Sequence, residues 1–298
     1  MLTSHLGELA ALLTAVFWTV SALAFENATI KVGTYAVNIL RLILGFILLT
    51  ILAYFNRGIL FPTDASLNAW FWLFISGIVG LVIGDLFLFA SYPIISSRVS
   101  MLIMTLAPPI AALMSWFVLD ETMSSLAIIG MFLVIFGISL TILSRHEGNG
   151  KMKLNYSIRG LLYAFVGTLG QAGGLVLSKL GMGDYNALAS TQIRLIAGFV
   201  GFALLITIVR KWKIVGNATK NRKAMIGTSI GSIFGPFLGI SFSLIAIQNT
   251  STGIAATLMA IVPVLIIPAA FFIFKQKVSL KEIIGAIISV AGVALFFI

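Results

Sequence analysis

Long apolar stretches dominate the chain, and short segments containing charge, glycine or proline separate them. The stretches are apolar on all sides and do not alternate, so they predict membrane-crossing helices and not the strands of a membrane barrel. Each is close to the roughly 20 residues that one crossing requires. The predicted spans are 6–26, 34–55, 68–92, 97–119, 124–143, 157–178, 185–209, 224–247, 251–274 and 279–298.

The pattern occurs twice. Arg41 recurs as Arg194 after 153 residues, and Pro108 recurs as Pro263 after 155. Five helices per repeat is an odd number, so the second repeat should enter the membrane in the opposite sense to the first. The sequence therefore predicts an all-α membrane protein whose ten transmembrane helices form two inverted five-helix repeats. The predicted units are repeat 1 (1–143), an exposed linker (144–156) and repeat 2 (157–298).

Composition agrees with a membrane location, because 60% of residues are hydrophobic and only 9% are charged, against about 25% charged in soluble domains. The spans leave no room for a soluble catalytic domain. The chain has no cysteine and two histidines, and it has no phosphate-binding loop and no nucleophile–base arrangement. We therefore expect neither an enzyme, nor a metal site, nor a cofactor.

The net charge of +10 does not predict nucleic-acid binding, because most of the basic residues lie between or at the ends of the spans. Fifteen of them follow odd-numbered spans, whereas only Arg57 and Lys179 lie on the other side. Cytoplasmic loops of membrane proteins carry the excess of Lys and Arg. We therefore expect both termini outside and a multi-pass protein in contact with lipid, in the cytoplasmic (plasma) membrane.

Three ionisable residues, Arg41, Asp85 and Arg194, lie well inside predicted spans, where charge is costly without a partner or water. Arg41 and Asp85 share a depth of about 10 Å on adjacent helices, at 1.5 Å per residue, so they should pair. Both arginines are either structural locks or substrate contacts. Asp85 is either a charge-neutralising partner or a group that carries a proton or binds a substrate amine. Asp85 is the one acidic residue expected well inside a span.

Helix breakers and small residues also have two interpretations. Pro108 and Pro263 should kink the middle of equivalent helices, for packing reasons or to form a gate. Glycines at a spacing of four let helices approach closely, either as static packing or as a sliding surface. This spacing occurs at Gly227, Gly231, Gly235 and Gly239.

Polar and aromatic residues in the middle of spans are candidates for a substrate cavity. Trp18 and Gln171 are equivalent across the repeat, as are Asn38 and Thr191. With Asp85, they would suit a mainly apolar cavity that binds a small organic solute. Interhelical hydrogen bonding is the simpler alternative for each of them.

The chain resembles the EamA-type transporters of the drug/metabolite transporter superfamily. The resemblance rests on Trp18, Arg41 and Pro108, on the LDET stretch at 119–122, and on recurring glycine-containing motifs. These motifs are Ile129-Gly130, Phe136-Gly137-Ile138, Ile284-Gly285 and Ala291-Gly292-Val293. The resemblance implies a cavity lined by the first four helices of each repeat, with the fifth of each at the periphery.

These features together predict a secondary transporter, most simply an exporter of a small metabolite or amino-acid-like solute, with a proton as a candidate coupling ion. The alternative is a membrane scaffold or assembly protein without transport. Intramembrane charge favours transport, because a scaffold gains little from it.

Overall fold

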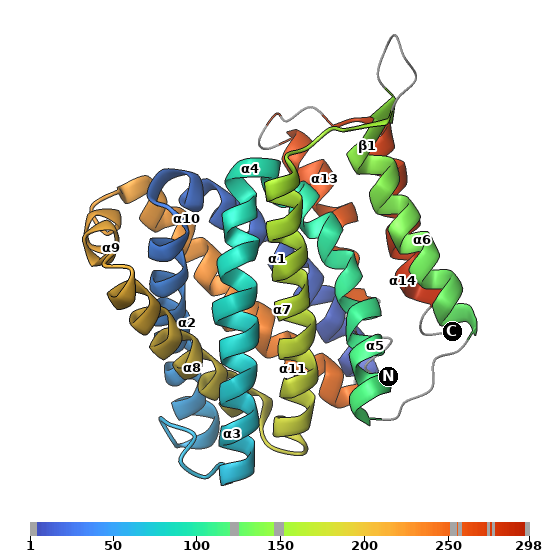
Figure 1. Ribbon diagram of the computed structural model, residues 1–298. Helices are drawn as coiled ribbons and strands as arrows, with labels where there is room; N and C mark the ends of the chain where they lie inside the picture. Colours follow the sequence, from blue (N-terminus) through green and yellow to red (C-terminus); the bar gives the residue numbers. More distant parts are fainter. Residues whose placement is uncertain are drawn as a thin grey trace.

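The computed structural model describes residues 5–119, 125–145, 152–250, 255, 258–272, 275 and 278–295. Within these ranges the chain is a bundle of apolar helices (Figure 1). The N-terminal half contains α1 (Leu6–Val32), α2 (Thr34–Arg57), α3 (Leu67–Ser76), η2 (Gly77–Gly84), α4 (Asp85–Ile103), η3 (Met104–Leu106), α5 (Ala107–Leu119) and α6 (Ser125–Ile142). The C-terminal half contains α7 (Ile158–Met182), α8 (Ala187–Ile208), α9 (Trp212–Ala218), α10 (Arg222–Ser232), η4 (Ile233–Phe237), α11 (Leu238–Asn249), α13 (Val262–Phe272) and α14 (Leu280–Leu295).

The described helices make the chain a multi-pass membrane protein. Six helical segments among the described residues are long and apolar enough to cross a membrane, and a shorter apolar helix covers Ile128–Thr141. One of the six, Leu67–Met114, has 48 residues, more than twice the length that a single crossing needs.

That long segment turns at Ser96, whose backbone lies outside the helical region at φ 66° and ψ 158°. The Ser91 and Ser100 hydroxyls are 2.7 Å apart across the turn, whereas nine residues of straight helix would separate them by about 13 Å. The segment therefore contains two of the helices that the sequence predicts.

The helices run between two faces. Figure 1 places the start of α1, the end of α14 and residues 58–66 at one face, which we call the terminal face. The opposite face, which we call the linker face, carries α9 and a two-stranded hairpin of β1 (Leu143–Arg145) and β2 (Met152–Leu154). Part of the expected linker is thus an antiparallel ladder, and the intervening 146–151 lie outside the described residues, as do Asp120 and Glu121.

The two halves interlock. The α3–η2–α4 segment of the N-terminal half packs on α7, and the α10–η4–α11 segment of the C-terminal half packs on α1. Glycine makes both contacts close: a Cβ at Gly170 would lie 2.5 Å from Cα of Gly84, and one at Gly231 would lie 2.3 Å from the Phe25 ring. The predicted glycine stripe is therefore a helix-packing surface, and sliding along it stays a prediction.

Each glycine-rich segment contains a stretch of π-helix that the sequence analysis did not predict. These stretches, η2 and η4, occupy equivalent places under the 155-residue shift. Such widened turns are uncommon and are frequent at functional sites. In η4 the widening accommodates Pro236, which cannot donate a backbone hydrogen bond.

The helices α6 and α14 pack against each other at one edge of the bundle (Figure 1). A Cβ at Gly137 would lie 2.5 Å from the carbonyl oxygen of Gly285. A Cβ at Gly285 would lie equally close, at 2.5 Å, to the carbonyl oxygen of Gly137. Gly130, Gly137, Gly285 and Gly292, seven residues apart in each helix, therefore all serve this one helix pair.

Candidate functional site

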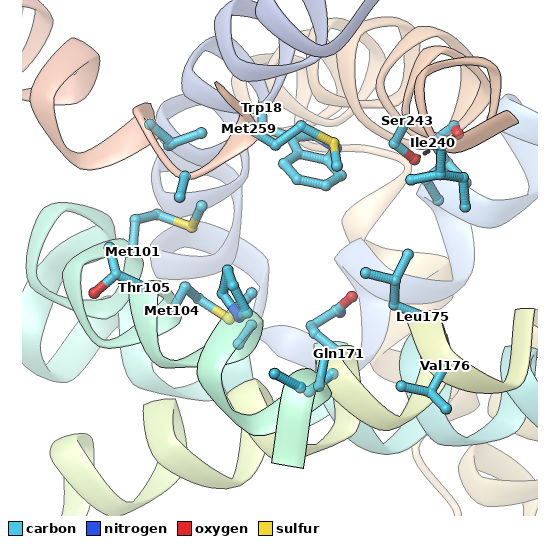
Figure 2. A pocket seen from close by; sticks show the side chains of 18 of the residues that line it. Trp18, Met101, Met104, Thr105, Gln171, Leu175, Val176, Ile240, Ser243 and Met259 are labelled. Atoms are coloured by element: carbon cyan, nitrogen blue, oxygen red, sulfur yellow. Dashed lines mark hydrogen bonds between the residues drawn. The ribbon is translucent and has the colours of Figure 1, made fainter. Parts of the chain in front are cut away.

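A cavity of about 380 Å³ lies between the two halves. Helices of both halves line it, with Trp18 from α1, Met104 from η3, Gln171 from α7 and Ser243 from α11. In Figure 2, Trp18 and Gln171 lie on opposite walls, and the Gln171 side chain points toward the space between them. A mainly apolar wall with a few polar groups is the usual composition of a site for a small organic molecule.

The cavity extends toward the terminal face. Lys179 and Ile247 line it, and they lie in the last turns of α7 and α11, which end at this face (Figure 1). Lys179 is exposed, so it marks the mouth of the cavity.

Behind the Gln171 wall lies a buried polar network. Arg41 forms an ion pair with Asp85, and both side chains are buried, so the expected contact between them is confirmed. The Nε of Arg41 donates to Asn38 at 2.9 Å, and its guanidinium lies over the Phe89 ring at 4.9 Å. Gln171 donates to Oδ1 of Asp85 at 2.6 Å. One side chain, Gln171, therefore joins the charged network to the cavity.

The structure brings some of the candidates to the cavity and leaves others behind its wall. Trp18, Gln171 and Arg194 line it. Asp85 and Asn38 belong to the network behind it, and Thr191 is buried with its hydroxyl bonded to the Ala187 carbonyl at 2.9 Å. Among the described members of this network, Gln171 is the one that lines the cavity.

Pro108 and Pro263 both line the cavity, and each follows a break in the α-helix near the middle of its predicted span, 97–119 or 251–274. Each lies in the first turn of a helix, α5 or α13, after η3 or a turn at 260–261. The helix is therefore interrupted close to both prolines, and a gate at these breaks stays a prediction. Proline is tolerated in a first turn, where its missing N–H has no helical partner to lose.

Three acid–base features escaped the sequence analysis. Glu26 is buried in α1 and accepts a hydrogen bond from Ser97 at 2.5 Å. Glu282 is also buried and lies 3.1 Å from Arg98. Lys179, assigned to a loop, lines the cavity. The expectation that Asp85 is the only deep acid was wrong, because α1 continues to Val32 and encloses Glu26. The sequence contains a signal for both residues, because Glu26 and Lys179 are charged residues at equivalent positions under the 153-residue shift.

A second link between the halves lies at the terminal face. Asp64 accepts hydrogen bonds from Tyr185 at 2.8 Å and from Arg57 at 2.5 Å. The Tyr185 hydrogen bond and the Arg57 charge hold the pKa of Asp64 below its ordinary value. A lowered carboxyl pKa stabilises the fold above the unfolded-state pKa, and this contribution disappears as the pH falls through the lowered value.

We therefore expect Asp64→Asn to lower the unfolding temperature slightly, by about 1–2 °C, because the cluster is exposed. The difference from the wild type should shrink as the pH falls from about 6 to about 3. Thermal unfolding of both proteins in the same detergent measures it. A difference that stays constant over this range would contradict the assignment.

Comparison with known proteins identifies relatives at two levels. The model of the EamA-like transporter family matches residues 5–143 and again 158–298. Among solved structures 26 chains match. One is a crystal structure with 18% identity and a TM-score of 0.64, and the match covers 97% of this chain and 95% of that one. At this identity it shows a shared fold alone. No curated protein matches the chain.

Proposed function

The chain belongs to the EamA-like transporter family, and on that basis we propose that it is a secondary transporter that exports a small organic solute by alternating access. The observation that carries this proposal is the cavity between the halves, which extends to the terminal face. Transporters built from inverted repeats bind solute at such an interface and expose it to each side in turn.

The proposal includes the ten-helix inverted repeat, with units 1–143 and 157–298. Three observations support it: the family matches each unit separately, the π-helical stretches occupy equivalent places, and each unit packs its glycine-rich segment on the first helix of the other. An inverted pair that interlocks in this way can rock about the shared contacts without losing them.

The described contacts on the linker side of the cavity support a closed state at that face. The tilted rings of Phe25 and Phe89 have centroids 4.9 Å apart. Glu26, the residue after Phe25, accepts a hydrogen bond from Ser97. Arg98 of the N-terminal half and Glu282 of the C-terminal half form an ion pair at 3.1 Å. Opening toward the linker face must separate Arg98 from Glu282.

A reversible cross-link between these two positions tests the mechanism. The natural chain has no cysteine, so Arg98→Cys/Glu282→Cys introduces the only two thiols. A short bifunctional thiol-alkylating reagent with a disulfide in its spacer should abolish solute efflux from cells or vesicles, because it holds the linker face closed. Reductant should restore efflux.

The single variants Arg98→Cys and Glu282→Cys are the matched controls, since each loses the ion pair without being able to cross-link. Full efflux by the cross-linked double variant would exclude alternating access at this face. A chain that moves no solute in either state, yet is needed for assembly of another membrane protein, would favour the scaffold alternative.

We place the protein in the cytoplasmic membrane with the basic linker face inside, following the distribution of Lys and Arg. The cavity then faces outward in this state, where an exporter releases its solute. A proton is the coupling ion that we favour, because Asp85 and Glu26 are carboxyl groups buried within the bundle.

A further inference from the structure

We propose that the solute is an organic anion, with one carboxylate-like group on an apolar body and no ammonium group. This inference rests on the proposed transport function and deepens it, because it names the class of solute that the same cavity takes. It departs from the amino-acid-like solute that the sequence analysis suggested. Three observations support it: the cationic side chains in the cavity wall, an unsatisfied hydrogen-bond donor of Arg194, and the apolar remainder of the wall.

The charged side chains that line the cavity are both cations. Lys179 and Arg194 contribute to the wall, and none of the lining residues among those described is acidic. Lys179 is exposed at the mouth, whereas Arg194 is only 5% exposed. An entering anion would therefore meet first a solvated charge and then a buried one, an arrangement that concentrates anions in a cleft with low-dielectric walls.

Arg194 has donor capacity that the described protein does not use. Its Nε is buried without a hydrogen-bond partner among the described residues. Among the described residues, the acidic side chain whose charge acts on Arg194 is Asp85. The two carboxylate oxygens of Asp85 are already bonded to Arg41 and Gln171. A buried guanidinium donor without an acceptor is costly, and an anionic solute group would supply the acceptor.

Gly80 leaves space for this guanidinium. A Cβ at Gly80 would lie 3.3 Å from Nη2 of Arg194, closer than ordinary van der Waals contact. The arginine thus lies directly over the η2 backbone, in the widened helical turn. Its repeat equivalent, Arg41, has its own acid in Asp85, whereas the residue equivalent to Asp85 is Ile240. The asymmetry between the repeats therefore leaves one arginine for the solute.

The rest of the wall suits an apolar body. Trp18, Met101, Met104 and Met259 lie around the space in Figure 2. A volume of about 380 Å³ accommodates a small organic molecule, and flexible methionine side chains adapt to bodies of different shape. An inorganic anion would fill only part of this space and would leave the apolar wall without a partner.

An ammonium group on the solute would lack an acidic partner among the described residues that line the cavity. It would meet Lys179 and Arg194, and the nearest carboxylate is engaged by Arg41. A buried charge without a partner is strongly unfavourable. The cavity should therefore discriminate between an acid and the amino acid that has the same body.

Four ligands with one body test the proposal: hexanoate, 2-aminohexanoate, hexylamine and hexan-1-ol. Binding to the purified full-length protein is measured by calorimetry and thermal shift. We expect hexanoate to bind about 10-fold or more tightly than the other three, and chloride or phosphate to compete weakly. Equal or tighter binding of the amino acid or the amine would overturn the proposal.

Arg194→Gln should weaken hexanoate about 10-fold or more and leave hexan-1-ol unchanged, because only the charged contact is lost. Lys179 lies at the exposed mouth of the cavity, where the fold tolerates substitution. Lys179→Gln should therefore weaken hexanoate binding about 3-fold. Lys31→Gln removes an exposed charge at the other end of α1 and should change nothing. Unchanged hexanoate affinity in the Lys179 and Arg194 variants would exclude their role.

The outcomes for this site and for transport are separate. Efflux of the amine or the amino acid, but not of the acid, would overturn the proposed anion site and support the transport function. Binding of hexanoate without efflux of any organic acid would keep the anion site and overturn the transport function.

Discussion

Arg41→Leu should destabilise the protein more than the double replacement Arg41→Leu/Asp85→Leu does. The single change leaves the buried Asp85 carboxylate with Gln171 as its remaining side-chain hydrogen-bond partner among the described residues. Breaking a buried ion pair from one side costs about 3–5 kcal/mol. Replacing both removes the orphan charge, so much of that loss should be recovered. Unfolding in detergent, followed by helical circular dichroism, measures both variants.

The exposed pair at the terminal face provides the matched control. Arg57→Leu removes an arginine from an ion pair with Asp64, whose side chain is 41% exposed, and surface pairs contribute about 0–1 kcal/mol. If Arg41→Leu were as mild as Arg57→Leu, Asp85 would not be held as a buried charge. Efflux by the double variant then tests proton coupling. If the folded double variant no longer responds to a proton gradient, Asp85 carries the coupled proton. If it responds fully, another group carries the proton.

The second large effect concerns the contact of α7 with η2. Gly170→Ala places a methyl group 2.5 Å from Cα of Gly84, where backbone meets backbone and no side chain can move aside. The helices must separate or bend, which we expect to cost about 1–3 kcal/mol or more. The yield of folded protein and its unfolding temperature measure the effect.

Gly173→Ala, three residues along the same helix, is the control. Its new methyl group would meet side chains of Val79 at 3.3 Å and Met114 at 3.5 Å, and both can adjust. This variant should remain close to the wild type. Equal stability of the Gly170 and Gly173 variants would show that α7 and η2 are not in the close contact described.

Much of the polar network could be predicted from the sequence, because depth in a membrane helix follows from counting residues. Arg41 and Asp85 share a depth on adjacent helices, and charge in hydrocarbon requires a partner. Their contact follows from these two facts. Gln171 as the third member could not be predicted, because it comes from the other half, and the pairing of α7 with η2 depends on tertiary packing.

The residues that escaped prediction share a different cause. Glu26 and Lys179 lie near helix ends, where the hydropathy pattern fixes boundaries only to within about 2–4 residues. An error of one turn moves a charge between loop and bundle. The π-helical stretches η2 and η4 leave no mark in residue periodicity, because apolar residues surround them on all sides. Only the backbone of the folded chain reveals them.

The interlocked packing also bears on how the protein is made. During synthesis, residues of the N-terminal half enter the bilayer before α7 exists, although the glycine face of α3–η2–α4 has its partner on α7. Until α7 is inserted, that face meets lipid chains, which cannot fill a groove shaped for a helix backbone. Neither half can complete its own packing alone. Final assembly is therefore a late event, which begins only after the second half of the chain has been synthesised.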